Sequence, residues 1–298
     1  MTAPHASPSP ATGTTLVIGA TGTTGSRVTA RLAAAGHAVK AAGRSGAAVA
    51  GAEPVRFDWY DPGTHDTALD GVERLYVIPP VGDPDPAASV LPFLRRARAR
   101  GVRRAVLLSA SSIPEGGPAA GRVHAALPGL FDEWAVLRPS WFMQNFTGDH
   151  LHARGIRADG VLVTAAGGGR VGFVDADDIA AVAVHALTDP RAPGTDLVLT
   201  GPRALSHDDI AAVLTEVTGR PVVHRPLPHA QMRERLARLM PPAFAAMLAD
   251  MDRAISEGAE DRVTDTVERL TGRPARTFRE HAERALLEQA GGPVSPGR

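Results

Sequence analysis

The sequence of 298 residues contains no cysteine, a single lysine at Lys40 and only two tyrosines, Tyr60 and Tyr76. Without cysteine the chain can form no disulfide, iron–sulfur cluster or cysteine-ligated zinc site, and it has no thiol nucleophile. The single lysine excludes every mechanism that needs a lysine at another position. No Gly-x-Ser-x-Gly segment occurs, so a serine hydrolase is not expected.

Acidic and basic residues are equally numerous, 32 of each, and the formal net charge is zero. Nucleic-acid-binding domains usually carry a basic excess, so nucleic acid is not an expected partner. No apolar run reaches the roughly 18 residues that a membrane helix needs, so no membrane partner is expected either. The first residues lack the basic and apolar regions of a signal peptide, and we expect a cytoplasmic protein. A homodimer remains open.

Short apolar segments alternate with helical patterns through the first half of the chain. Such alternation predicts right-handed crossovers between the strands of a parallel sheet. Helices are expected from about residue 24 to 35 and from about 86 to 100. The expected strands of this half span residues 15–20, 39–43, 54–57, 74–78, 104–109 and 134–137.

The pattern after residue 140 is looser and becomes mostly helical from 229 to 289. We expect a helix over 177–188, headed by Asp178, and another that Ser206 caps. The methionine-rich stretch 229–257 suits either a lid over an apolar substrate or ordinary helical core. Further strands are expected at 160–165, 170–174 and 196–200. The expected organisation is a disordered tail (1–14), a dinucleotide-binding core (15–150), a mixed region ending in a substrate or lid part (151–290) and a frayed tail (291–298).

A glycine-rich segment, Gly19-Ala-Thr-Gly22-Thr-Thr-Gly25, lies between the first strand and the first helix. In this setting the first glycine allows a tight turn, the second lets the backbone approach a pyrophosphate, and the third lets helix and strand pack closely. The start of the helix offers free N–H groups to the phosphates. The segment therefore predicts a dinucleotide site, for which the candidate residues are Gly19, Thr21, Gly22, Thr23, Thr24 and Gly25.

The end of the second strand distinguishes the two nicotinamide dinucleotides. An NAD site usually has a carboxylate there to bind the ribose hydroxyls, whereas this chain has Arg44 and Ser45. A guanidinium and a hydroxyl suit the 2′-phosphate of NADPH, so NADPH is favoured over NADH, unless Arg44 is merely a solvated loop residue. Asp58, after the third strand, could reach the adenine or cap the turn that follows. Pro79 and Pro80, after the fourth strand, are expected to touch the cofactor through their backbone.

Several longer segments carry a family resemblance. They are Val17 to Gly25, Leu137-Arg-Pro-Ser-Trp-Phe-Met-Gln-Asn-Phe146, Arg170 to Ala180 and Leu199-Thr-Gly-Pro202. The chain resembles the NmrA-like branch of the atypical short-chain dehydrogenases/reductases, and within it the festuclavine-dehydrogenase type and its bacterial relatives. The resemblance implies an α/β Rossmann fold, a doubly wound parallel sheet with a smaller, mostly helical C-terminal substrate domain. It also implies NAD(P)H as cofactor. Members include iminium and quinone reductases, as well as regulators that bind the cofactor without turning it over.

Active members of that superfamily usually use a Tyr-x-x-x-Lys pair, which this chain lacks, since Thr64 and Pro80 stand four positions after its tyrosines. Carbonyl reduction needs a proton donor for the developing alkoxide. An iminium is already electrophilic, and hydride addition neutralises it without creating an anion. Orientation of the substrate and exclusion of water then provide most of the catalysis that such a reduction needs. A regulator without turnover would lack the pair as well.

The remaining candidate catalytic residues are Ser109, Ser111 and His124. Both serines follow the fifth strand and either hydrogen-bond to substrate or nicotinamide or simply cap the strand. His124 lies on a short helix and is either a proton donor or a surface histidine. The substrate-pocket candidates, each with core packing as the alternative, are Trp141, Phe142, Met143, Asn145 and Phe146.

The sequence thus predicts an NADPH-dependent reductase that transfers hydride to a small apolar electrophile, in the first place an imine or iminium. A quinone reductase and a cofactor-binding redox regulator without turnover are the alternatives. Asp149, His150 and His152 lie close together but lack further ligands at defined spacing, so no metal site is expected.

Overall fold

The computed structural model of the chain describes residues 13–83 and 85–290. Residues 1–12 and 291–298, where tails without structure are expected, lie outside these ranges, and Thr14 already belongs to the first strand. The described residues form two compact units. The first contains those of Met1–Ser109, Ile113–Leu137 and Ala180–Asp196, and the second those of Ala110–Ser112, Arg138–Ile179 and Leu197–Arg298.

The main sheet has the strand order β3-β2-β1-β4-β5-β6-β9. Every neighbouring pair from β3 through to β6 runs parallel. The direction in which strands are added reverses between β1 and β4, which is the doubly wound arrangement that the sequence predicts. The strands are β1 (Thr14–Ile18), β2 (Val39–Gly43), β3 (Glu53–Arg56), β4 (Val72–Val77), β5 (Arg104–Leu108), β6 (Glu133–Pro139) and β9 (Asp196–Leu199).

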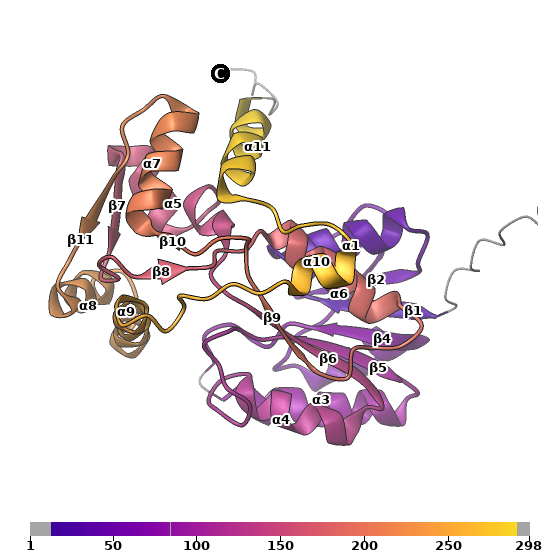
Figure 1. Ribbon diagram of the computed structural model, residues 1–298. Helices are drawn as coiled ribbons and strands as arrows, with labels where there is room; N and C mark the ends of the chain where they lie inside the picture. The colour runs from indigo at the N-terminus through magenta and orange to yellow at the C-terminus, as the bar shows by residue number, and fades with distance from the viewer. Residues whose placement is uncertain (1–12, 84, 291–298) are drawn as a thin grey trace, which may run out of the picture. The chain divides into compact units, whose positions relative to one another are not determined.

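Helices cover both faces of this sheet, with α3 and α4 on one face and α1 and α6 on the other (Figure 1). The core between sheet and helices is aliphatic, with Leu16, Leu75 and Leu107 of the strands fully buried. Burial on both faces explains why these strands are nearly continuous apolar runs. The helices are α1 (Gly25–Ala34), α2 (His65–Leu69), α3 (Ala87–Ala99), α4 (Gly121–Leu130) and α6 (Ala176–Thr188), with a 3-10 turn, η1 (Pro62–Thr64), before α2.

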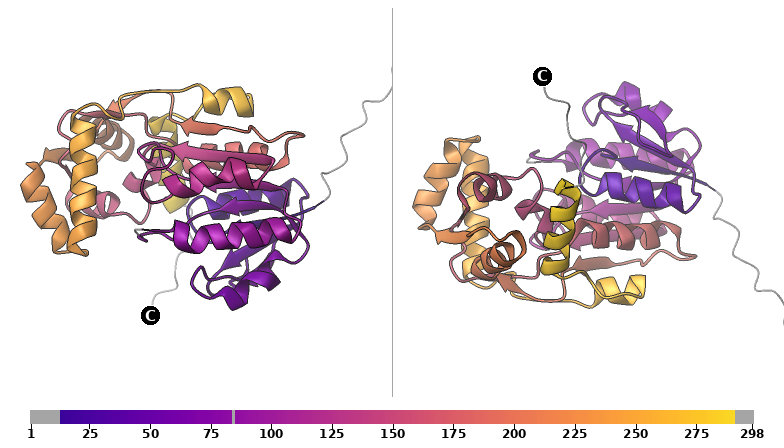
Figure 2. Two further views of the ribbon diagram at one scale, coloured as in Figure 1. Left: turned by 90° about the horizontal axis from the view of Figure 1, so that it is seen from below. Right: turned by 90° about the horizontal axis from the view of Figure 1, so that it is seen from above.

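The second unit combines two small sheets with six helices in the described residues. β7 (Val161–Thr164) pairs in parallel with β11 (Val223–Pro226), and β8 (Arg170–Val171) pairs antiparallel with β10 (Leu205–Ser206). α8 and α9 lie side by side (Figure 2). The helices are α5 (Leu151–Asp159), α7 (His207–Thr218), α8 (His229–Ala237), α9 (Pro242–Ser256), α10 (Thr266–Thr271) and α11 (Phe278–Ala290), together with the 3-10 turn η2 (Met143–Phe146).

The start of α7 confirms Ser206 as its N-cap. The Ser206 hydroxyl accepts a hydrogen bond from the Asp209 amide (3.1 Å), and the Asp209 carboxylate accepts one from the Ser206 amide (2.9 Å). This reciprocal pair satisfies two amides that would otherwise have no partner in the first turn. The Ser206 amide also holds the pKa of the Asp209 carboxyl below its ordinary value.

The expectation that Asp178 heads α6 is wrong. The helix begins at Ala176, and Asp175 is the residue before it, with its Oδ1 accepting a hydrogen bond from the Asp177 amide (2.8 Å). Asp178 instead accepts a hydrogen bond from the Arg276 amide (2.7 Å) and forms an ion pair with Arg273 (2.8 Å). Asp178 therefore ties down the segment before α11.

Several elements differ from the sequence analysis: α2, α5, β10 and β11 were not expected, and β8 is shorter than expected. α5 was not expected because it contains Gly155 and buries only Ala153 completely, so its apolar periodicity is weak. The strand expected over 170–174 ends at Val171, because the Gly172 carbonyl accepts the Ser140 hydroxyl and the Gly201 amide instead of continuing the pairing with β10.

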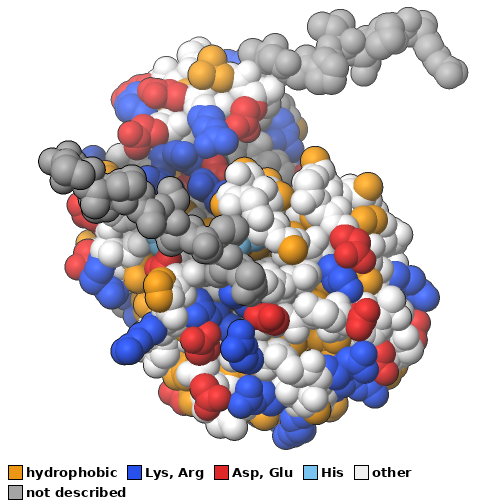
Figure 3. Space-filling model, turned by 90° about the vertical axis from the view of Figure 1, so that its right-hand side faces the viewer, with side chains coloured by type: hydrophobic (Ala, Val, Ile, Leu, Met, Phe, Trp, Pro, Cys, Tyr) orange, Lys and Arg blue, Asp and Glu red, His pale blue; other side chains and the backbone are white. Residues whose placement is uncertain are grey.

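No helix among the described residues is both long and apolar enough to cross a membrane. Acidic and basic side chains are interspersed over the face shown in Figure 3, without a large area of either sign. This distribution accompanies the equal numbers of acidic and basic residues in the sequence.

Candidate functional site

The glycine segment forms a tight turn between β1 and α1. Gly19 has a φ of +73°, which favours glycine, and its carbonyl accepts the Gly22 amide (2.9 Å). A Cβ at Gly25 would overlap the Gly19 carbonyl, so only glycine fits there. A Cβ at Gly22 would stand 3.3 Å from the same oxygen, and Gly22 itself is exposed. The turn thus leaves open backbone on its outer side.

The N-terminus of α1 is suited to an anion. Its first turn has no acidic residue, and the Thr24 side chain, which is buried, does not cap it. Thr21 and Thr23 are exposed on the turn. Uncapped amides and the positive end of a helix favour a phosphate group. The space that a Cβ at Gly22 would fill is also left open. Together these features fit the pyrophosphate of a dinucleotide.

Arg44 and Ser45 lie in a turn directly after β2, closed by a hydrogen bond from the Gly46 amide to the Gly43 carbonyl (3.1 Å). Both side chains are exposed, and Arg44 makes no ion pair or hydrogen bond with a described residue. The guanidinium is therefore available to a ligand phosphate. β2 and β1 are neighbours, so this turn and the glycine turn share the carboxyl edge of the sheet.

Asp58 stabilises the chain after β3. Its Oδ1 accepts the Tyr60 amide (3.0 Å), and its carbonyl accepts Nε2 of His65 (2.9 Å). The indole of Trp59 donates to the Ile78 carbonyl (3.1 Å), which joins this segment to the end of β4. Asp58 does not cap the turn Asp61-Pro62-Gly63, which was the alternative to an adenine contact, because the Asp61 carboxylate itself accepts the Gly63 amide there (3.2 Å). A contact with adenine stays a prediction.

Pro79 and Pro80 follow directly after Ile78 and are partly exposed. The Ile78 side chain is the nearest neighbour that a Cβ at Gly19 would meet, at 3.2 Å. The two prolines therefore begin beside the glycine turn, at the point where the strand order reverses. Their contact with the cofactor stays a prediction.

Ser109 follows β5, and its amide donates to the Leu137 carbonyl of β6 (2.8 Å). Its hydroxyl is buried and has no hydrogen-bond partner among the described residues. A buried hydroxyl without a partner is unfavourable unless a ligand forms a hydrogen bond with it. This observation fits a hydrogen bond to nicotinamide or substrate.

His124 lies in α4 and is only 3% exposed. The alternative of a surface histidine is therefore wrong, because α4 turns this side chain toward the interior of the first unit. A role as proton donor stays a prediction.

Ser111 belongs to the second unit and lies in a polar cluster. Its hydroxyl donates to Oε2 of Glu260 (2.8 Å), a residue that is 4% exposed. Its carbonyl accepts from Arg138 (3.0 Å) and from Arg262 (3.2 Å). The Arg262 guanidinium also lies 3.7 Å from the Glu260 carboxylate. The local fold thus orients the Ser111 hydroxyl toward a buried carboxylate.

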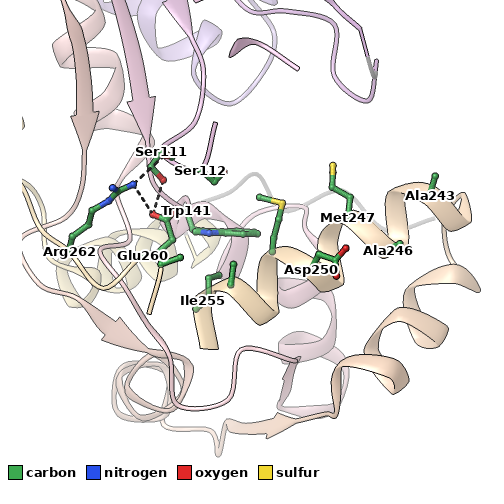
Figure 4. Close-up of a pocket in the computed structure, with 13 residues that line it drawn as sticks. Ser111, Ser112, Trp141, Ala243, Ala246, Met247, Asp250, Ile255, Glu260 and Arg262 are labelled. Carbon is green, nitrogen blue, oxygen red and sulfur yellow. Dashed lines mark hydrogen bonds and ion pairs between the residues drawn. The ribbon is translucent and has the colours of Figure 1, made fainter. Parts of the chain in front are cut away.

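This cluster borders a cavity of about 710 Å³ within the second unit (Figure 4). Trp141 lies beside Glu260, and α9 supplies an apolar wall. A smaller space of about 150 Å³ shares Ser111 and Trp141 and adds Phe142 and Asn145. Residues lining the larger cavity include Ser112, Ala246, Met247, Asp250, Met251, Ala254 and Ile255.

The predicted pocket segment is thus divided between two environments. Trp141, Phe142 and Asn145 line cavities, whereas Met143 and Phe146 are 1% and 3% exposed and line neither. Phe146 packs edge-on against Phe173 at 5.1 Å between ring centres. For Met143 and Phe146 the pocket interpretation is therefore corrected to core packing. The 3-10 turn η2 points both inward.

Glu260 and Arg262 were not identified from the sequence. They lie 149 and 151 residues after Ser111 in the sequence, and no motif marks them. The methionine-rich stretch gave a partial signal. Met247 and Met251 line the cavity, while Met232 and Leu236 pack in a core of their own with Ala245.

The histidines of the second unit differ in exposure, from His207 and His281, which are buried, to His229, whose side chain is 30% exposed. No group of three or more His, Asp or Glu side chains among the described residues is placed to hold a metal ion. Burial lowers the pKa of His152 well below its ordinary value and that of His207 to about 3. Both are neutral at pH values near 7 and pack against aromatic rings.

A family model described as NAD(P)H-binding matches residues 19–190. The uncharacterized oxidoreductase YesF of Bacillus subtilis is 44% identical over 268 residues, which cover 90% of this chain and 93% of that protein. Festuclavine synthase II of Penicillium roqueforti is 36% identical over 282 residues, covering 91% of this chain and 97% of that protein.

Among solved structures, the triphenylmethane reductase of Citrobacter sp. has a TM-score of 0.77 and 25% sequence identity. The similarity covers 93% of this chain and 100% of that chain. Both the fold and the sequence similarity therefore extend over almost the whole molecule.

Proposed function

The chain belongs to the NAD(P)H-binding oxidoreductase family that includes YesF and festuclavine synthase II, and we propose that it is an NADPH-dependent reductase of an imine or iminium. Membership of this family confirms the resemblance to the festuclavine-dehydrogenase type and makes the chain an NAD(P)H-dependent oxidoreductase. The choice of NADPH and the class of electrophile are the parts that we propose.

The first unit would hold the cofactor. The glycine turn and the N-terminus of α1 would bind the pyrophosphate, since backbone amides face an open cradle there. Arg44 would bind the 2′-phosphate with charge-assisted hydrogen bonds. No carboxylate stands at the end of β2 to repel that phosphate. The buried Ser109 hydroxyl, which has no partner among the described residues, would form a hydrogen bond with the nicotinamide or the substrate.

The choice of electrophile rests mainly on the missing proton donor. The chain has no Tyr-x-x-x-Lys pair, and Tyr76 is fully buried in β4, where burial raises the pKa of its hydroxyl. When bound, the reduced nicotinamide supplies a hydride that forms a C–H bond at the iminium carbon, while the C=N π electrons move to nitrogen. The product amine is neutral, and a neutral imine reacts in its protonated form with the proton taken from solvent, so no protein group has to protonate an alkoxide. The chain's residues then need only to orient the substrate and exclude water.

The names of relatives agree with a nitrogen-containing substrate. One is a festuclavine synthase, and another, from Claviceps fusiformis, is an agroclavine dehydrogenase that is 41% identical over 74% of this chain. These names describe those proteins. They support a reductase of C=N bonds here without identifying its substrate.

The test is steady-state oxidation of NADPH by the purified protein, followed by the loss of NADPH absorbance. Dihydroisoquinoline serves as the imine and menadione as the quinone. We expect turnover with the imine that exceeds turnover with the quinone, and an amine product detected by mass spectrometry. Preference for menadione would replace the proposal with a quinone reductase. NADPH binding without turnover of either acceptor would favour a redox regulator.

A further inference from the structure

The cavity of the second unit contains a carboxylate that the hydride transfer itself does not require. Glu260 is 4% exposed and lines the cavity beside Trp141 (Figure 4). Its Oε2 accepts the Ser111 hydroxyl at 2.8 Å, and Arg262 lies 3.7 Å away. No described residue donates a hydrogen bond to Oε1. This oxygen is not a fully buried atom and lies open to the cavity, where a ligand with a donor group can bind it.

Ser111 and Arg262 flank the Glu260 carboxylate. Ser111 has one hydroxyl proton, which points to Glu260, so its oxygen is left as an acceptor toward the cavity. Arg262 donates to the Ser111 carbonyl at 3.2 Å and forms a longer ion pair with the carboxylate, at 3.7 Å. The end of the cavity at Ser111 and Glu260 therefore offers the Ser111 oxygen and the carboxylate as acceptors, with the partly exposed guanidinium of Arg262 beside them.

Trp141 and α9 add to the selection of a cation. The Trp141 side chain lies between Glu260 and the methionines of α9 in the cavity lining (Figure 4). An indole face attracts a cation within about 6 Å of its centre. The wall opposite is built mostly from alanine, methionine and isoleucine, and such surroundings strengthen charge interactions relative to water.

We propose that this cavity recognises a positively charged nitrogen, and that Glu260 is the residue that selects for it, with Ser111 and Trp141 beside it. The substrate class is then a protonated imine, an iminium or the corresponding cationic amine. A quinone presents only acceptor oxygens and would be opposed by this carboxylate. The inference deepens the proposed function and rests on it for the identification of the cavity as the substrate site.

A binding experiment without chemistry tests the inference. Protonated tetrahydroisoquinoline and isochroman, its neutral oxygen analogue of nearly equal shape, are titrated into the full chain by calorimetry. We expect the wild-type protein to bind the amine about tenfold or more tightly than the ether, as a partly buried charge pair allows. Equal affinity for the two probes, or failure to bind the amine, overturns the inference without any variant.

Two variants locate the effect. Glu260→Gln keeps the shape and removes the charge, so amine affinity should fall about tenfold while ether affinity stays unchanged. Asp149→Asn is the control, because Asp149 belongs to the same unit, is exposed, pairs with Arg154 at 2.8 Å and does not line the cavity. Its effect should be less than about twofold. Equal losses for both probes in Glu260→Gln would show that Glu260 is only structural.

Measurements of imine reduction distinguish this inference from the proposed function. Selective binding of the amine through Glu260 without reduction of dihydroisoquinoline would leave the inference standing and overturn the reductase. Reduction of the imine with an unchanged kcat/KM in Glu260→Gln would do the reverse.

Discussion

A side chain at Gly25 would overlap the carbonyl oxygen of Gly19, which fixes the distance between the end of β1 and the start of α1. At Gly22, by contrast, an added Cβ would meet that oxygen at 3.3 Å, within reach of a small adjustment, and would point toward solvent. The two glycines therefore serve different purposes. One shapes the turn, and the other keeps its outer surface open.

Gly22→Ala should consequently fold normally. Its affinity for NADPH should fall about tenfold or more, because the added methyl group occupies the space through which the pyrophosphate approaches the backbone. Gly25→Ala should lower thermal stability as well. Gly129→Ala in α4, where nothing lies within 4 Å of the added atom, is the control and should leave NADPH affinity unchanged without lowering thermal stability, since alanine favours a helix over glycine. Calorimetric titration and thermal unfolding measure the two effects, and unchanged NADPH affinity in Gly22→Ala would contradict the site.

Arg44→Ala should remove the preference for the phosphorylated cofactor. We expect NADPH affinity to fall about tenfold, roughly 1.4 kcal/mol, with little change for NADH, because only the 2′-phosphate contact is lost. Titration of wild-type and variant protein with both cofactors measures this, and NADH is the internal control. A parallel loss for both cofactors would show that Arg44 supports the turn instead.

Lys40 should prove structural rather than catalytic. It is 9% exposed, and its Nζ donates to the Asp70 carbonyl after α2 at 2.8 Å. Lys40→Met should lower the free energy of unfolding by about 1–3 kcal/mol, because that carbonyl loses its donor, and should leave kcat/KM within about threefold. Arg56→Met on the neighbouring strand removes only an exposed ion pair with Asp61 (3.3 Å) and should cost less than about 1 kcal/mol. Chemical denaturation and steady-state kinetics provide the two readouts.

The buried histidines predict a loss of stability in mild acid. Burial, and then repulsion by His224, lowers the pKa of His207 to about 3 in the folded protein, whereas an unfolded chain has about 6.5. Over this pH range the unfolded state binds a proton that the folded state does not bind. The free energy of unfolding therefore falls as the pH drops below about 6.5 toward 3. Between pH 7.5 and about pH 5 the loss from His207 should be about 2 kcal/mol.

Urea unfolding across this pH range measures the slope, and His207→Leu should flatten it. Its ring packs near Phe146 and Phe173, so leucine keeps an apolar filling of the space. A variant whose profile is as steep as that of the wild type would assign the acid sensitivity to another group, such as His152.

The strands β1, β2 and β5 could be predicted because nearly all their residues are buried and each reads as an apolar run. β2 is an example, with Val39–Gly43 expected and observed. The helix α5 shows the limit of sequence patterns, because it contains Gly155 and buries only Ala153 completely. Propensity and periodicity are weak in such segments, and tertiary packing decides their structure.

The cofactor turn could be recognised from local spacing alone, since three glycines in seven residues encode both the turn and its openness. The cavity could be predicted only in part, since Ser111 and Trp141 were candidates and line it, whereas Glu260 was not. Glu260 meets Ser111 only after the chain has passed through most of the second unit, and neither residue lies in a motif. Which of the aromatic residues after β6 faces the cavity also depends on the 3-10 turn η2, whose short length leaves no periodic pattern.

The burial of Lys40 has a practical consequence. It carries the only side-chain amine of the sequence, and its nitrogen is held beneath α2. An amine-reactive reagent can reach it only when that part of the first unit opens. The rate at which a label appears on Lys40, read by peptide mass spectrometry, therefore reports local opening between β2 and α2. The molecule thus carries its own probe of local opening on β2, the strand that leads into the turn of Arg44.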